Sequence, residues 1–314
     1  MANVQLVPSH VEEQGTHAAD ALLEVGWLLV AVLTPLGVNL WARQPFEPPK
    51  AALLRSLVWL MAGVWLARCL LAHRSPWREL GGNPLRWPAL AAAAVLALAT
   101  VFAVDRRLSL WGSYERAQGA LTLLSYPLLF LLVAARLRTL DGARRLLGAM
   151  LVTGAPLVGI GLAQALGWEP IGLISDARSP VYATLGRPNF LGAYLAMLLP
   201  LTLTLVMARP RWLRIAGAAL ALLEAIVVAL TLARGAWLAA VVAVGTFGLL
   251  WYWPRLTRPW RTAATASGLV GLGGGLVWAL WLGQAQGGST AARLTIWRAT
   301  LDFIVQISLS GLAT

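Results

Sequence analysis

The sequence contains few of the residue types that bind metals, form disulfides or carry surface charge. It has one cysteine and three histidines, and only 12% of its 314 residues are charged. A single cysteine excludes an internal disulfide. The histidines, His10, His17 and His73, are too scattered to predict a metal site. We therefore expect no metal and no other cofactor.

Lysine is also almost absent, occurring only as Lys50, although basic residues outnumber acidic ones by 25 to 13. The arginines gather between apolar runs, a pattern typical of contact with anionic lipid headgroups. No soluble stretch carries a basic stripe with interleaved aromatics, so we exclude a nucleic-acid partner. Hydrophobic residues make up 59% of the chain and the mean hydropathy is +0.70, which predicts a polytopic membrane protein.

Nine apolar runs are each about long enough to cross a bilayer as a helix. A tenth begins near Leu301. The fold class we predict is therefore an all-α integral membrane bundle of about nine to ten transmembrane helices, which would occupy residues 22–314 after a short cytoplasmic tail at 1–21. The tail has no basic residue and so does not resemble a signal peptide. The nine runs are 22–41, 51–72, 88–104, 119–135, 146–167, 188–207, 214–232, 235–253 and 263–282.

The charges of the connections orient this bundle. With a cytoplasmic N-terminus, fourteen of the 25 basic residues fall on the inner side and eleven on the outer side. This bias favours a multi-pass protein with its N-terminus in the cytoplasm. The positive-inside rule disfavours basic residues on the outer side, so eleven there are unusually many. An anionic substrate at the outer leaflet would account for them.

The segment 184–194, Thr-Leu-Gly-Arg-Pro-Asn-Phe-Leu-Gly-Ala-Tyr, opens one of the apolar runs. Pro188 suits the first position of a helix, and Asn189 can bond neighbouring backbone groups. The unpaired N–H groups and positive dipole end of this helix, with Arg187 beside them, would favour a bound anion. The alternative is a helix cap with one snorkelling arginine.

Polar residues also cluster in the connection 111–116, Trp-Gly-Ser-Tyr-Glu-Arg. Tyr114 and Arg116 stand there close to Asp105 and Arg106, and we expect them to contribute to an outer binding site. A solvated loop with a local ion pair explains the segment equally well.

Two later outer segments carry arginine. Arg234 lies in a very short connection, 233–237, and burial at the bilayer centre would cost about 2.5 to 3.5 kcal/mol on insertion scales, so it should reach the interface or a wet cavity. Arg293 begins the segment 293–298, Arg-Leu-Thr-Ile-Trp-Arg, after a polar linker. An amphipathic segment on the outer surface is the alternative for this second case.

These four segments, in the chain order 111–116, 184–194, 233–237 and 293–298 between helices, resemble motifs of the O-antigen ligase family of bacterial membrane glycosyltransferases, which also includes lipid-linked glycan polymerases. The resemblance covers about residues 100–314. It implies metal-independent transfer of a glycan from an undecaprenyl-pyrophosphate carrier to an acceptor hydroxyl, at the outer face of the bacterial cytoplasmic membrane. The acceptor would be a glycan, a lipid or a protein.

The resemblance also implies residue roles. Arg234 matches an arginine that holds the donor pyrophosphate, Arg187 and Asn189 match the helix-start motif, and Arg293 matches the basic residue that enters a large external loop. Family members carry a histidine in that loop as the expected base, whereas this sequence ends at Thr314. We therefore expect a truncated family member with weak or absent activity, and we name no catalytic residue.

Glu224 lies in the middle of an apolar run. A carboxyl group at that depth is a candidate proton relay or ion ligand, although a neutral acid bonded to Gln164 or to a backbone carbonyl is the alternative. It leads to a rival hypothesis, a transporter or flippase of an anionic lipid-linked glycan. A non-catalytic membrane partner in envelope assembly is a third possibility.

Overall fold

A computed structural model describes residues 10–80, 83–137, 139–169, 181–262, 265–268, 271, 273–274 and 295–303. The chain divides into two compact units, Met1–Ala243 and Val244–Thr314. Helices α1 to α9 and the start of α10 belong to the first unit. The described residues are all-α, without a strand.

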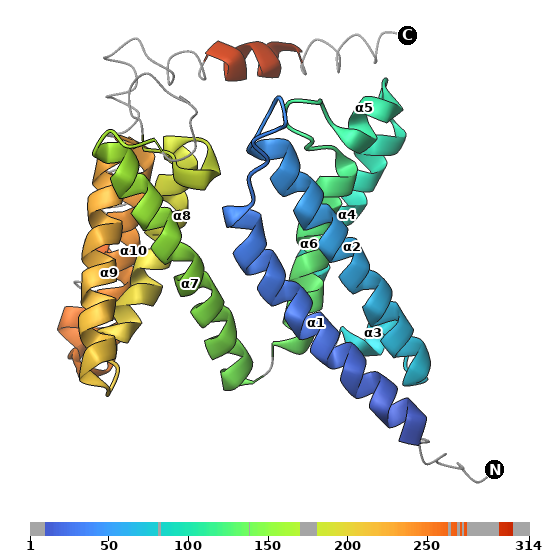
Figure 1. The fold of residues 1–314 in the computed structure, drawn as a ribbon, viewed down its shortest axis with the longest axis horizontal. Coiled ribbons are helices and arrows are strands. Elements are labelled where there is room, and N and C mark those ends of the chain that lie inside the picture. Colours follow the sequence, from blue (N-terminus) through green and yellow to red (C-terminus); the bar gives the residue numbers. More distant parts are fainter. Residues whose placement is uncertain are drawn as a thin grey trace. The chain divides into compact units, whose positions relative to one another are not determined.

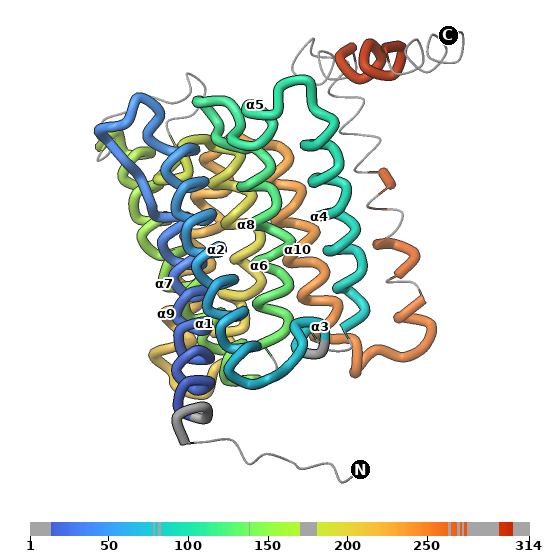
Figure 2. The backbone as a smooth tube through the Cα atoms, turned by 90° about the vertical axis from the view of Figure 1, so that its right-hand side faces the viewer, coloured from blue at the N-terminus to red at the C-terminus, as the bar shows by residue number. Residues whose placement is uncertain are grey.

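Each of the first eight predicted apolar runs overlaps one of the long helices (Figures 1 and 2). Short helices occupy the connections. The elements are α1 (His10–Leu36), α2 (Glu47–Leu71), α3 (Pro76–Glu79), α4 (Arg86–Val101), α5 (Arg106–Trp111), α6 (Ala120–Arg136), α7 (Leu140–Ala165), the 3-10 turn η1 (Ala183–Leu185), α8 (Pro188–Leu205), α9 (Arg211–Leu230), α10 (Arg234–Tyr252) and the 3-10 turn η2 (Trp253–Arg255).

Six of these helices are long and apolar enough to cross a membrane: α1 from Gln14, α2, α7, α8, α9, and α10 continued to Arg255. Helices α4 and α6 are apolar but shorter, at 16 and 17 residues. The predicted run at 263–282 lies largely outside the described residues, as does most of the predicted tenth run.

Helix α1 already begins at His10, inside the segment 1–21 that was predicted as the cytoplasmic tail. Asp20, which belongs to the same segment, connects it to other helices. Its carboxylate forms ion pairs with Arg68 of α2 and Arg136 of α6, so this part of the chain packs against the bundle. Residues 1–9 lie outside the described part.

Two hydrophobic cores hold the first unit together. One lies between α1, α2 and α6 and includes Trp27, Val58 and Leu132. The other lies between α7, α8 and α9 and includes Leu157, Leu195 and Val227. Helices α1 and α7 pack against each other and so join the two groups of helices.

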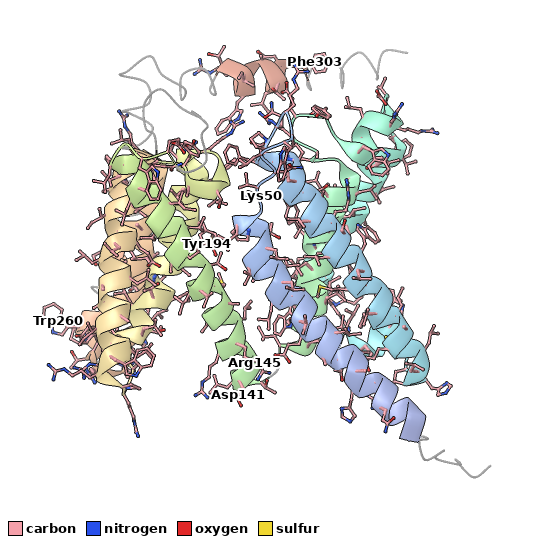
Figure 3. The ribbon with its side chains drawn as sticks, in the orientation of Figure 1. Lys50, Asp141, Arg145, Tyr194, Trp260 and Phe303 are labelled. Atoms are coloured by element: carbon pink, nitrogen blue, oxygen red, sulfur yellow. The ribbon has the colours of Figure 1, made fainter. Side chains whose placement is uncertain are left out.

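The α1–α2 connection is fixed by the single lysine. The Nζ atom of Lys50 donates hydrogen bonds to the carbonyl oxygens of Thr34 (3.2 Å), Pro35 (2.7 Å) and Gly37 (2.7 Å). Figure 3 labels Lys50 close to the end of α1. An ammonium group has three donors, and here all three are used on carbonyls that the end of α1 leaves without helical partners. We call this side of the first unit the Lys50 end.

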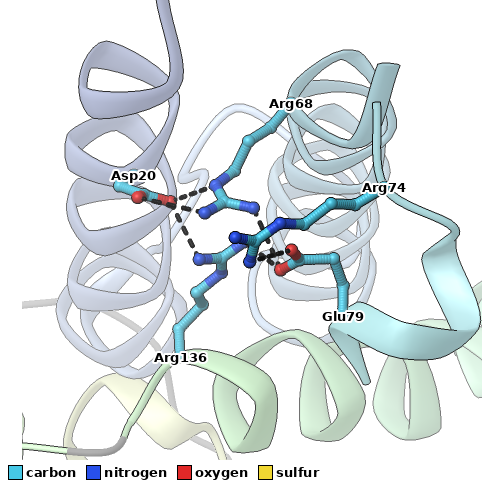
Figure 4. Close-up of polar contacts among 5 residues, drawn as sticks. All are labelled: Asp20, Arg68, Arg74, Glu79 and Arg136. Atoms are coloured by element: carbon cyan, nitrogen blue, oxygen red, sulfur yellow. Dashed lines mark hydrogen bonds and ion pairs between the residues drawn. The ribbon is translucent and has the colours of Figure 1, made fainter. Parts of the chain in front are cut away.

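At the opposite side, the Arg68 end, charged residues from four helices form one network (Figure 4). Arg68 Nη1 and Arg136 Nη2 lie 2.9 and 3.0 Å from Glu79 Oε2, and Arg74 Nη1 lies 3.4 Å from Glu79 Oε1. Arg68 Nε and Arg136 Nη1 lie 2.5 and 3.0 Å from Asp20 Oδ1. The network fastens α1, α2, α3 and α6 to one another.

The charges of this network shift the pKa of Glu79. Burial of its carboxyl group would raise the pKa, but the positive charges of Arg68 and Arg136 outweigh that effect and hold the pKa below its ordinary value of 4.5. The ionised form is therefore favoured in the folded protein.

We expect Lys50→Met to lower the free energy of unfolding by about 1.5 to 3 kcal/mol, the net value of a hydrogen bond to a charged group, because three carbonyls lose their donor. Thermal unfolding of the detergent-solubilised chain measures the change. Arg43→Met is the matched control, since Arg43 is exposed in the same connection. Equal shifts in the two variants would contradict this role of Lys50.

A second prediction concerns pH. Because the pKa of Glu79 is depressed in the folded state, its contribution to stability should be complete above about pH 4.5 and should be lost as the pH falls through the lower folded value. At neutral pH we expect Glu79→Gln to cost about 1 to 3 kcal/mol, between the values for exposed and buried ion pairs. In melting curves at decreasing pH, the gap between wild type and Glu79→Gln should close. A gap that stays constant down to acid pH would refute this assignment.

Candidate functional site: the Lys50 end

The predicted helix start at 184–194 is present. Helix α8 has Pro188 as its first residue and Arg187 as its N-cap, with φ −145° and ψ 138°. Gly186 precedes them with φ +78°, and a Cβ atom there would lie 2.5 Å from the ring of Phe46. This position therefore requires glycine both for its backbone angle and for the close approach of the α1–α2 connection.

Arg187 faces that same connection. Its Nε lies 3.2 Å from Glu47 Oε1, at the start of α2, and its guanidinium lies 5.9 Å from the ring centroid of Phe190. About half of the Arg187 side chain remains exposed (54%). Glu47 thus places a carboxylate where an anionic ligand was predicted, and a ligand would share or take over this arginine.

Further contacts anchor the segment before Arg187. The Oγ1 of Thr184 donates to the carbonyl oxygen of Pro35 (2.8 Å), one of the carbonyls that Lys50 also caps. The ring of Tyr182 meets Phe46 edge to face at 5.8 Å. Gln164 of α7 accepts hydrogen bonds at Oε1 from the N–H groups of Tyr182 (3.0 Å) and Ala183 (2.8 Å). The segment is therefore held by both α7 and the α1–α2 connection.

Asn189 and Arg234 lie at the same end, and both are exposed. Asn189 is the second residue of α8 and Arg234 is the first residue of α10. The two helices pack closely at Gly192, where an added Cβ would lie 2.5 Å from the Cβ of Ala236. This contact lies close to the start of each helix, and Arg187, Asn189 and Arg234 are all within five residues of it in the sequence.

Two side-chain hydrogen bonds stabilise the α9–α10 turn. The indole Nε1 of Trp237 donates to the carbonyl oxygen of Val228 (3.0 Å), and the Oγ1 of Thr231 donates to the same oxygen (2.7 Å). These bonds pin the first turn of α10 against the end of α9, and so they set the position of Arg234. That this arginine reaches the interface or a wet cavity stays a prediction.

Tyr114 belongs to a second group of residues at the Lys50 end. It lines a cavity of about 580 Å³ between the start of α2 and the α5–α6 connection. Arg116 is exposed in that connection but is not among the lining residues. The lining residues are Pro48, Ala52, Arg55, Asp105, Arg107, Leu108, Trp111, Gly112, Ser113, Tyr114 and Ala117.

Arg55 and Arg107 in this lining were not among the predicted site residues. The guanidinium of Arg55 lies over the ring of Trp111, 5.1 Å from its centroid. Asp105 caps α5, its Oδ1 accepting from the N–H of Leu108 (2.9 Å). In the sequence, Arg55 is a single polar residue inside an apolar run. Its position in the cavity lining becomes apparent only from the contact between α2 and α5.

The first turns of α2 connect the two groups. Glu47 pairs with Arg187, and the next residue, Pro48, lines the cavity together with Ala52 and Arg55. Glu47 was also missed, because it is 140 positions away from Arg187 and no local pattern links them. Tyr114 and Arg187 are therefore linked through adjacent residues of α2, since Arg187 pairs with Glu47 and Tyr114 lines the cavity with Pro48.

Two other predictions concern residues away from these groups. Arg293 lies outside the described residues, so its predicted role stays a prediction. His73 follows the end of α2, at the Arg68 end, remote from Arg187 and Arg234. Across the described ranges, no group of three or more His, Cys, Asp or Glu residues could hold a metal ion.

Glu224 of α9 is fully buried, and its Oε1 accepts a hydrogen bond from the Oγ1 of Thr202 in α8 (2.9 Å). The alternative partner that the sequence suggested, Gln164, is wrong, because that amide bonds the backbone before α8. Glu224 thus links α8 to α9 in the second core.

Comparisons with models of protein families, with curated proteins and with solved structures find no match for this chain. The arrangement of its own residues therefore supplies the evidence on function. Chemically, the Lys50 end offers exposed guanidinium groups beside two helix N-termini and a cavity lined by arginine and aromatic side chains. Both features suit anionic groups.

We expect Gly192→Ala to lower the free energy of unfolding by about 1 to 3 kcal/mol, because the added methyl group would overpack the contact between α8 and α10. Gly235→Ala is the matched control in the first turn of α10, where an added Cβ meets nothing within 4 Å. Thermal unfolding compares the two. A Gly192→Ala protein as stable as the control would show that the two helices do not pack closely here.

Proposed function

We propose that the Lys50 end binds the pyrophosphate of a polyprenyl-linked glycan. The observation that supports this is the contact between Gly192 of α8 and Ala236 of α10, which lies within five residues of Arg187, Asn189 and Arg234 in the sequence. The same residues match the motifs that resemble the O-antigen ligase family. The lipid tail would lie along apolar helix surfaces, and the charged group would stay at the level of the helix starts.

The physical argument rests on charge and geometry. A guanidinium binds phosphate oxygens with two parallel hydrogen bonds, and at 4 Å two opposite charges attract by about 4 kcal/mol at an effective dielectric of 20. The N-termini of α8 and α10 add N–H groups and positive dipole ends. Binding would draw Arg187 away from Glu47, so part of the gain offsets the loss of that ion pair.

The reaction we propose is transfer of the glycan to an acceptor hydroxyl of a glycan, lipid or protein. As the bond to the pyrophosphate breaks, negative charge develops on the leaving group, and Arg187 and Arg234 would stabilise it without a metal. We assign no base to the described residues, because His73 lies at the opposite end. The proposal for this chain thus extends to donor binding and stabilisation of the leaving group.

The proposed setting is a bacterial cytoplasmic membrane with about nine to ten transmembrane helices. Helices α4 and α6 would cross in addition to the six longer ones, and the remaining spans would come from the region after Arg255. On the charge bias, the N-terminus and the Arg68 end would lie in the cytoplasm and the Lys50 end outside.

A second candidate function is supported by Glu224. A carboxyl group that is fully buried in the second core, bonded to Thr202, is the kind of residue that carries protons or ions in transporters. On this alternative the same arginines would bind an anionic lipid-linked glycan that the protein moves across the membrane. Movement of a lipid-linked glycan across a proteoliposome membrane that is lost in Glu224→Gln, while binding of the glycan survives in that variant, would favour it.

We expect Arg187→Gln and Arg234→Gln each to weaken binding of undecaprenyl pyrophosphate by about tenfold or more, because each removes a charged hydrogen bond to phosphate worth about 1.5 to 3 kcal/mol. Titration of the protein in lipid nanodiscs, followed by native mass spectrometry, measures the affinity. Arg106→Gln is the control, as an exposed arginine of α5 at the same end. If all three variants lose affinity alike, the effect is one of general charge and the proposed site is wrong.

A further inference from the structure

The cavity beside α5 is a candidate site in its own right. Its volume of about 580 Å³ lies within the range of about 300 to 1,000 Å³ that is typical of ligand sites. Its lining combines two arginines, two aromatic rings and the apolar side chains of Pro48, Ala52 and Leu108. Neither Arg187 nor Arg234 belongs to it, so it is distinct from the pyrophosphate site proposed above.

The position of the cavity relative to a bilayer follows from α2, one of the helices long enough to cross a membrane. Pro48, Ala52 and Arg55 are the second, sixth and ninth residues of this 25-residue helix. At 1.5 Å per residue the helix is about 37 Å long, whereas the hydrocarbon core of a bilayer is about 30 Å thick. The first turn of α2, with Pro48, therefore reaches the boundary between the lipid headgroups and the hydrocarbon core. Arg55 lies about 10 Å further along the helix, so the cavity extends from this boundary toward the core.

The charges of the lining define the ligand further. Arg55 and Arg107 are positive and Asp105 is negative, so the lining carries one net positive charge. This balance matches a phosphodiester, with one negative charge, better than a pyrophosphate, with two. The contact of Arg55 with the ring of Trp111 holds the guanidinium beside the cavity, where its N–H groups can reach phosphate oxygens.

We propose that this cavity binds the phosphodiester headgroup of an anionic glycerophospholipid. Arg55 and Arg107 bind the phosphate, while Pro48, Ala52 and Leu108 contact the glycerol and the first carbons of the acyl chains. Trp111 and Tyr114 lie at the polar edge, where aromatic side chains with one polar atom are favoured in membrane interfaces. The bound lipid would act as a structural partner between α2 and the α5–α6 connection.

The test is native mass spectrometry of the full chain, released from detergent after addition of phosphatidylglycerol or phosphatidylcholine. We expect phosphatidylglycerol to be retained in preference, and Arg55→Gln with Arg107→Gln to reduce its retention by about tenfold or more. Arg106→Gln is the matched control, because Arg106 precedes Arg107 in α5 and is not in the lining. Equal retention of the two lipids, or an equal loss in the control, would overturn the proposal.

Two further arms identify the source of the phosphate and the place of binding. Ala52→Leu fills the cavity without changing any charge, so it should also reduce retention, and full retention would overturn the proposal. Inorganic phosphate, added at rising concentration, should leave the bound lipid in place. If it displaces the lipid, the site recognises free phosphate instead. Failure of the pyrophosphate site would appear separately, in Arg187→Gln and Arg234→Gln.

Discussion

The ammonium group of Lys50 is the interaction on which the Lys50 end depends. It closes the end of α1 by satisfying three carbonyl oxygens, and in doing so it fixes where α2 begins. One turn of α2 then supplies Glu47 to Arg187 and Pro48 to the cavity. Pro35 joins the same arrangement, since its carbonyl oxygen accepts from both Lys50 and Thr184. An arginine is too large and too planar to replace such a three-way cap, which gives a physical reason for the only lysine among 25 basic residues.

The two ends of the first unit use charge differently. At the Arg68 end, three arginines form ion pairs with Asp20 and Glu79. At the Lys50 end, Arg187 is half exposed and has one carboxylate beside it, and Arg55 and Arg107 border a cavity. The first arrangement fastens helices, whereas the second leaves guanidinium groups at a surface that a ligand can reach. This contrast adds to the support for the anion site proposed at the Lys50 end.

Much of the fold could be predicted from the sequence, because long apolar runs bounded by arginine and proline determine where helices begin and end. Pro188 as the first residue of α8 is one example that the structure confirms. The site could be predicted only in part. Arg187, Asn189 and Arg234 were predicted from local motifs, but the contact between their helices depends on Gly192 and Ala236, which are 44 positions apart. Glu47, Arg55 and Arg107 were missed for the same reason, since contacts between distant segments leave no local pattern. Gln164 shows the converse error, because two polar residues at similar depth suggested a pair that packing does not make.

The division of the first unit into two cores has a consequence for biogenesis. Residues up to Arg136 contain all the helices of the first core, and they leave the ribosome before any helix of the second core exists. Lys50 can therefore close the α1–α2 connection early. The contacts of Phe46 with Tyr182, and of the Pro35 carbonyl oxygen with Thr184, can form only later, when the segment after α7 has been synthesised. The late segment docks on a surface that is already formed. Membrane insertion of this chain should thus proceed in two stages, with the arginines of α8 and α10 brought together only in the second.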